Sequence, residues 1–175
     1  MSTIQNWQEF IVHQRQNETG CIPTGYEMLL RAAGVEYVDY STFQEDFDLD
    51  IEKDFRKDHP ENNFDSVAQV IQGSYPDVHF AREIFEKGEG KNKLAKIEAL
   101  LGNSQFILIS LAMSPFGSMG WHIMPVVDAD DEFLHLLYIV DKAGNPDVRP
   151  IKKKDFVQIH EAFDGGNDIA YLESW

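Results

Sequence analysis

Hydrophobic residues recur at helical spacing through the first half of the chain. Within residues 23–34, Tyr26, Leu29 and Ala33 share one face, and Gly34 follows as a residue that tolerates the left-handed backbone of a helix end. Similar apolar stripes recur elsewhere in this half. We therefore predict helices over residues 4–14, 23–34, 63–72 and 91–101.

The pattern changes in the second half, where apolar runs rich in β-branched residues replace the helical period. Residues 105–113 are typical of a buried strand, and 122–127 and 133–140 flank an acidic turn, which predicts a hairpin. A short helix over 153–163 and a closing strand over 168–175 complete the chain. Helices followed by an antiparallel sheet indicate an α+β fold.

Length and composition fit one globular domain, residues 1–175. Apolar residues make up 43% of the chain, whereas 30 acids against 15 bases give a net charge of −15. Such a surface repels phosphate backbones, so we expect no nucleic-acid partner. The acidic run over residues 45–61 is interpreted as a solvated surface.

The sequence predicts a cytoplasmic protein. The N-terminus lacks a basic stretch followed by an apolar one, which argues against a signal peptide. No segment reaches the roughly 20 apolar residues of a membrane span, so we expect no membrane association. The single cysteine excludes an internal disulfide and favours a reducing compartment.

That cysteine, Cys21, is the first candidate for chemistry. It stands just before Pro23, with Gly20 before it, a pattern that predicts a tight turn entering a helix. A helix N-terminus favours the thiolate form through its free amides and its dipole. We expect Cys21 to be partly accessible and reactive at neutral pH, although a lone cysteine is more often a small buried hydrophobe.

The predicted hairpin supplies two partners for a nucleophile. His122 begins one strand and Asp141 follows the other, and a regular hairpin centred on the acidic turn sets them opposite each other. A cysteine nucleophile needs a base, and the base needs a group that orients it. An oxyanion donor is needed as well. Besides the Cys21 amide, Gln16 or alternatively Gln14 could supply it.

The order of these motifs resembles the papain-like cysteine peptidases, most closely the branch of the bacteriocin-leader (double-glycine) peptidases. The resemblance rests on residues 16–30 around Cys21, on 106–110, on 120–127 around His122, and on 138–141. It implies Cys21 as nucleophile, His122 as base, Asp141 as orienting acid, and a glutamine about six residues before the cysteine. Ile22 stands where that family commonly has glycine.

The function expected from these residues is a thiol hydrolase that cleaves a peptide or isopeptide bond through an acyl-enzyme. The same residues could serve a deamidase or an acyltransferase, and the alternative class is a catalytically silent binding module. Gly120 and Trp121, which lead into His122, are candidates for substrate binding. The expected partner is a peptide or protein substrate, basic in character because the chain is acidic.

We expect no metal or other cofactor. His13, His59, His79, His135 and His160 show no metal-ligand spacing with one another or with Cys21. Each is interpreted as a surface residue or a satisfied polar one.

Overall fold

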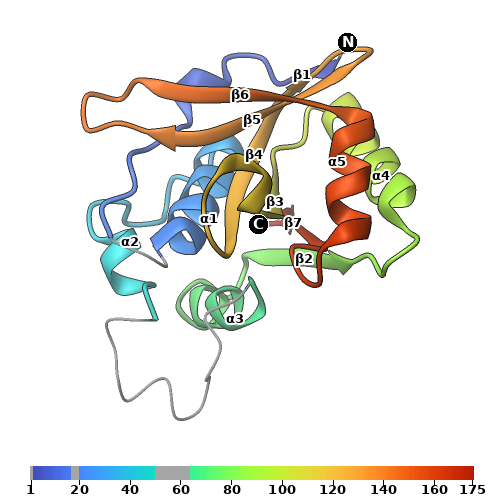
Figure 1. Ribbon diagram of the computed structural model, residues 1–175. Coiled ribbons are helices and arrows are strands. Elements are labelled where there is room, and N and C mark those ends of the chain that lie inside the picture. The colour runs from blue at the N-terminus through green and yellow to red at the C-terminus, as the bar shows by residue number, and fades with distance from the viewer. Residues whose placement is uncertain (1, 17–19, 50–63) are drawn as a thin grey trace.

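The structure, a computed structural model, describes residues 2–16, 20–49 and 64–175 (Figure 1). Within them, one antiparallel sheet has the strand order β2-β7-β3-β4-β5-β6, and β1 pairs with the end of β4. The strands are β1 Ser2–Thr3, β2 His79–Ile84, β3 Ile107–Ala112, β4 Trp121–Ala129, β5 Phe133–Val140, β6 Pro146–Lys152 and β7 Asp168–Ser174. The helices are α1 Cys21–Ala32, α2 Phe43–Asp46, α3 Phe64–Ser74, α4 Gly90–Gly102 and α5 Lys153–Ala162, with 3-10 turns at Trp7–Glu9 and Ser114–Phe116.

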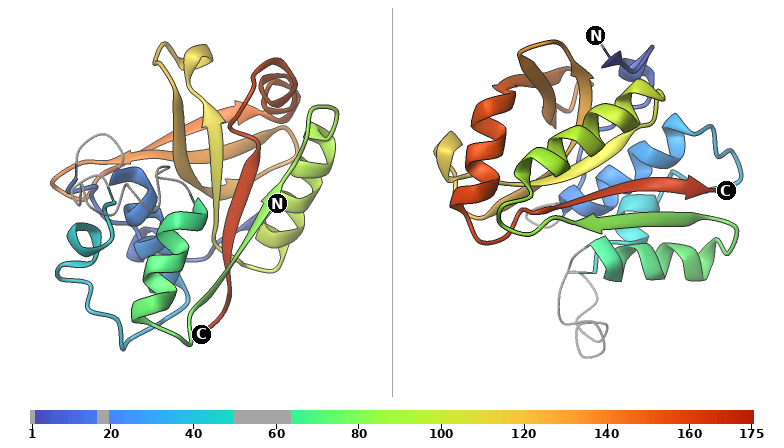
Figure 2. Two further views of the ribbon diagram at one scale, coloured as in Figure 1. Left: turned by 90° about the horizontal axis from the view of Figure 1, so that it is seen from below. Right: turned by 90° about the vertical axis from the view of Figure 1, so that its right-hand side faces the viewer.

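Helices cover both faces of the sheet. Helices α1 and α3 lie on one side, and α4 and α5 lie together on the other (Figure 2). Every residue of the central strand β3 is accordingly buried, as expected for a strand covered on both faces. The site described below lies where the N-terminal end of α1 meets β4 and β5.

Helix α1 has the boundaries that its sequence favours. It begins at Cys21 with Gly20 as N-cap, and Pro23 in its first turn removes an amide that would have no partner there. At the other end Gly34 adopts a φ of 73°. Its amide bonds to the Arg31 carbonyl, and the next amide reaches back to Leu30, which is the Schellman arrangement.

The α+β fold is confirmed, and so are the predicted helices from 23 onward and the predicted strands. Residue 63, the first of one predicted helix, lies outside the described residues. Strands β2 and β6 were not anticipated. Both are edge strands with few fully buried residues, and β6 contains Pro146 and Pro150, a residue type that is common in edge strands and rare in central ones.

The predicted helix over residues 4–14 is wrong. Only Trp7–Glu9 form a single 3-10 turn, and the residues that follow have no regular structure. The Ile4 amide instead bonds to the Val127 carbonyl beside β1, so this segment runs along the sheet. In this segment, tertiary contacts with the sheet outweigh the helical preference that the spacing of its apolar residues indicates.

None of the helices in the described ranges is long and apolar enough to cross a membrane.

Candidate active site

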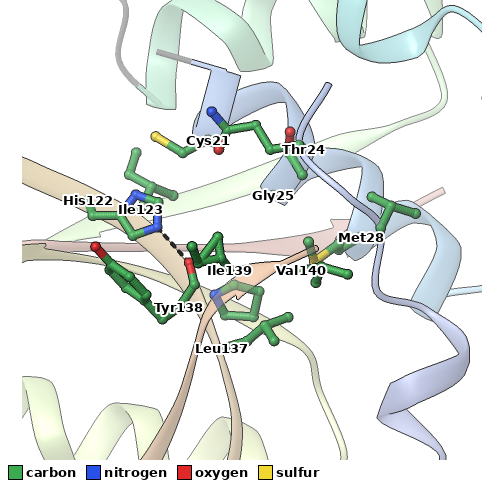
Figure 3. Close-up of a pocket in the computed structure, with 13 residues that line it drawn as sticks. Cys21, Thr24, Gly25, Met28, His122, Ile123, Leu137, Tyr138, Ile139 and Val140 are labelled. Atoms are coloured by element: carbon green, nitrogen blue, oxygen red, sulfur yellow. Dashed lines mark hydrogen bonds between the residues drawn. The ribbon is translucent and has the colours of Figure 1, made fainter. Parts of the chain in front are cut away.

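A small pocket brings together the predicted nucleophile and the predicted base. Cys21 and His122 both line a cavity of about 30 Å³ between α1 and strands β4 and β5 (Figure 3). Its other walls are mostly apolar. They comprise Val12, Gln14, Thr24, Gly25, Met28, Ile123, Pro125, Leu137, Tyr138, Ile139 and Val140.

Cys21 is the first residue of α1 and is partly buried. Burial raises the pKa of its thiol above the usual value, and the Asp48 carboxylate adds to that effect. Hydrogen bonds from the backbone amides of Ile123, Cys21 and Ile22 act in the opposite direction. The helix N-terminus therefore solvates the sulfur as expected, but burial outweighs it, so the resting form is a thiol and not the expected thiolate.

His122 lies at the start of β4 and is fixed through one ring nitrogen. Its Nε2 lies 2.9 Å from the carbonyl oxygen of Tyr138, and since a carbonyl only accepts, the proton of a neutral ring sits on Nε2. The other nitrogen, Nδ1, is on the edge of the ring that faces the Cys21 sulfur (Figure 3). A neutral ring would therefore present a lone pair to the thiol.

The charge state of His122 fits this arrangement. Burial lowers the pKa of the imidazole, the hydrogen bond to Tyr138 raises it, and the positive charge of Arg149 lowers it again. The net shift is downward, so the ring is neutral at neutral pH. A neutral base beside a neutral thiol is suited to taking the thiol proton during attack.

Asp141 does not orient His122 in the structure, and that expectation is corrected. Its carboxylate instead closes the turn after β5. Oδ1 accepts the amides of Ala143 and Asn145, each at 2.8 Å, and Oδ2 accepts the Asn145 side-chain amide at 2.9 Å. These contacts lower the pKa of the exposed Asp141 carboxyl, and the hydrogen bond from the Asn145 side chain has the largest effect.

A β-bulge explains the difference. Near the turn the hairpin has the predicted register, since Asp128 pairs with His135. The register then shifts by one residue, because Val126 pairs with Leu136. A one-residue shift changes which side chains face each other across the strands, so Asp141 no longer stands opposite His122.

The two candidate oxyanion glutamines point in different directions, and the preference for Gln16 is corrected. Gln14 lines the pocket with Cys21 and donates one Nε2 hydrogen to the Gln16 carbonyl at 2.8 Å. The Gln16 side chain instead bonds to the Glu45 carboxylate. Arg15 has the largest effect in lowering the pKa of the Glu45 carboxyl, and the hydrogen bond from Gln16 adds to it. Gln14 has a second amide hydrogen for a ligand.

A buried polar cluster, not anticipated from the sequence, holds the segment that carries Gln14. The fully buried Gln44 accepts the Arg15 amide at 2.7 Å and donates to the His13 carbonyl at 3.0 Å, so it bonds on both sides of Gln14. Its amide also donates to Glu27 of α1 at 2.9 Å. The only sequence signal was a glutamine amid the apolar positions of residues 43–49.

Neither Trp121 nor Gly120, the two residues predicted to bind substrate, lines the pocket. The indole of Trp121 rests on the backbone of Gly165 and Gly166, where an added Cβ would approach it within 2.9 Å, and the residue is 58% exposed. Gly120 takes a φ of 78°, and its carbonyl accepts the Met113 amide. No group of three or more His, Cys, Asp or Glu residues in the described ranges is placed to hold a metal ion.

Comparison with known proteins supports the fold. No protein-family profile matches the chain, and no curated protein matches it in sequence. Among solved structures it is similar to one described as a "putative C39-like peptidase" from Bacillus anthracis. The two superpose with a TM-score of 0.61 over 100% of both chains, at 13% sequence identity. The α+β architecture is therefore that of a C39-like peptidase fold.

Proposed function

We propose that this protein is a cysteine hydrolase that cleaves a peptide or isopeptide bond through an acyl-enzyme on Cys21. The observation that carries the proposal is the pairing of a helix-terminal thiol with an imidazole whose far nitrogen is bonded to a backbone carbonyl. That hydrogen bond directs the basic nitrogen of His122 toward the sulfur (Figure 3). The similarity to a C39-like peptidase structure agrees with this chemistry at the level of the fold.

The resting charges define the first step. Because the thiol and the imidazole are both neutral, Nδ1 of His122 takes the proton from Sγ as the sulfur attacks the substrate carbonyl. The tetrahedral oxyanion accepts hydrogen bonds from the Cys21 amide and from the free amide hydrogen of Gln14. The His122 imidazolium then protonates the leaving amine, the C–N bond breaks, and a thioester on Cys21 remains.

The second half of the reaction regenerates the enzyme. Neutral His122 removes a proton from water, which attacks the thioester and releases the acid, and the proton returns to Sγ. In place of a carboxylate, the Tyr138 carbonyl fixes the tautomer of the ring throughout. The proposed steps use only side chains and backbone groups of the protein, together with water.

A fluorogenic peptide library tests the proposal with the wild type, Cys21→Ser and His122→Ala. We expect turnover by the wild type and a loss of at least about 10³-fold in either variant. Acid quenching during turnover, followed by mass spectrometry, should locate an acyl adduct on Cys21. Turnover that survives in Cys21→Ser, or a wild type that binds library peptides without cleaving them, would overturn the proposal in favour of a different nucleophile or a binding module.

A further inference from the structure

Tyr138 occupies an irregular position in β5. The β5–β6 ladder passes from Leu137 to Ile139 and leaves Tyr138 as the additional residue of a β-bulge. A bulged residue is released from the regular ladder, so its carbonyl is free to accept another donor. That donor is His122, at 2.9 Å.

The side chain of Tyr138 belongs to a stack that runs inward from the surface. The guanidinium carbon of Arg149 lies 3.5 Å from the centre of the Tyr138 ring, which is a close cation–π contact. Asp147 bonds to the same guanidinium at 3.0 and 3.2 Å. On the inner side, the Tyr138 ring meets the His122 ring nearly at right angles, with centroids 5.4 Å apart.

We propose that Tyr138 and Arg149 are positioning residues that hold the His122 imidazole in the orientation needed for proton exchange with Cys21. This inference rests on the proposed function. The carbonyl of Tyr138 fixes one nitrogen, the ring of Tyr138 limits rotation about the His122 side-chain bonds, and Arg149 holds that ring in place. The stack thereby does what an orienting carboxylate would otherwise do.

The stack also differs from a carboxylate in its charge. The groups that face His122 are the Cys21 thiol from α1, the Tyr138 hydroxyl and ring from β5, and the Arg149 guanidinium from β6. An orienting carboxylate would stabilise the imidazolium, whereas the cation of Arg149 destabilises it. Arg149 therefore adds to the larger effect of burial in keeping the base neutral at rest, in agreement with the neutral thiol beside it.

Substitutions separate the contributions of the ring and the charge. Tyr138→Phe keeps the ring and should lower kcat less than Tyr138→Leu, which should lower kcat about 10-fold to 100-fold with little change in KM. Arg149→Met should raise the pKa of His122, while Arg149→Lys keeps the charge and should restore that pKa but not the full kcat. Lys152→Met is the matched control, since it removes another β6 cation 5.9 Å from a β5 ring, that of Phe133, and should change neither quantity.

The titration of the His122 ring is measured by NMR on protein with isotope-labelled histidine, without any need for turnover. An unchanged titration in Arg149→Met together with unchanged kcat in Tyr138→Leu would overturn the positioning role even if Cys21-dependent cleavage is found. Conversely, the expected upward shift in a protein that cleaves nothing would uphold the electrostatic part and refute the hydrolase. The two failures are therefore distinguishable.

Discussion

Gly25 of α1 and Leu108 of β3 lie so close together that only glycine fits between helix and sheet. A Cβ atom at Gly25 would lie 2.8 Å from Cδ1 and 3.0 Å from Cδ2 of Leu108. Because Leu108 is fully buried, it has little freedom to move aside. This approach sets the height of α1 above the sheet, and hence the position of Cys21 over β4.

Gly25→Ala should therefore displace α1 and lower both stability and activity. Overpacking of this kind costs about 1–3 kcal/mol, and a small shift of the nucleophile should reduce kcat about 10-fold or more. Urea unfolding and peptide turnover measure the two effects. The matched control is Gly73→Ala in α3, where an added Cβ meets no atom within 4 Å and should stabilise by roughly 0.5–1 kcal/mol. Equal effects of the two substitutions would contradict the packing argument.

Gln14, not Gln16, should support the oxyanion. Gln14→Ala is expected to lower kcat about 10²-fold to 10³-fold, as loss of one oxyanion donor does, with a smaller change in KM. Gln16→Ala is the natural control because its side chain bonds to Glu45 and does not line the pocket. Steady-state kinetics of both variants decide the matter; a larger kcat defect in Gln16→Ala would restore the assignment made from spacing.

Asp141 should matter for the β5–β6 turn more than for catalysis. Asp141→Ala removes the acceptor of two backbone amides, so thermal stability should fall while kcat changes less than about tenfold. Because the folded-state pKa of Asp141 is lowered, its stabilising effect is present above the usual carboxyl pKa and is lost on acidification. The stability difference between wild type and variant should thus shrink in acid. A kcat loss of about 10⁴-fold would instead identify Asp141 as the orienting acid.

The outcome at Asp141 and His122 shows how far the hairpin could be predicted. The turn and the pairing of Ala129 with Leu134 follow from alternating apolar residues around an acidic stretch. The register beyond them depends on a β-bulge at Val127. The sequence does not reveal that bulge, because Val127 is one of several similar apolar residues in the strand. The group that orients His122 is a backbone carbonyl. Because every residue has a backbone carbonyl, the identity of the side chains could not predict which residue provides it.

The glutamines show a second limit. Residues 10–16 have no regular structure, so no periodicity tells which side chain points inward. The buried amide of Gln44, which bonds on both sides of Gln14, decides that orientation through tertiary contacts. Cys21, in contrast, could be placed from local signals, because Gly20 and Pro23 mark the start of α1.

Lys93 should make the stability of the fold rise with pH. Its side-chain amino group is fully buried and donates to the carbonyls of Ser110 at 3.1 Å and Gly166 at 2.8 Å. Burial lowers its pKa from 10.5 to about 7, although the charge of Asp168 opposes this. Between those two values the unfolded chain binds a proton that the folded protein does not, so unfolding becomes less favourable as pH increases.

Urea unfolding of the wild type and Lys93→Met between pH 6 and pH 10 tests this. The wild type should gain stability relative to the variant above about pH 7, by at most about 1.4 kcal/mol for each pH unit. Other titrating groups cancel in the comparison because both proteins share them. If the two free energies of unfolding changed in parallel with pH, or if the wild type became less stable relative to Lys93→Met as pH increases, a neutral buried amine would be contradicted.

The substrate should be a basic or neutral chain. We propose this from the net charge of −15 and from the acidic residues beside the pocket. The run over residues 45–61 is described up to residue 49; within that part Asp48 already acts on the Cys21 thiol, and Glu45 bonds to Arg15, next to Gln14. A field of this sign attracts lysine and arginine and repels carboxylates before contact is made.

The decisive quantity is kcat/KM for matched peptides that differ only in basic or acidic residues flanking the cleaved bond. Basic peptides should be faster at low salt, and the advantage should shrink as salt is added, because screening acts over about 8 Å at physiological ionic strength. An uncharged peptide of the same length is the control and should show little salt dependence. Acidic peptides turned over as fast as basic ones at low salt would falsify electrostatic steering while leaving the roles of Cys21 and His122 untouched.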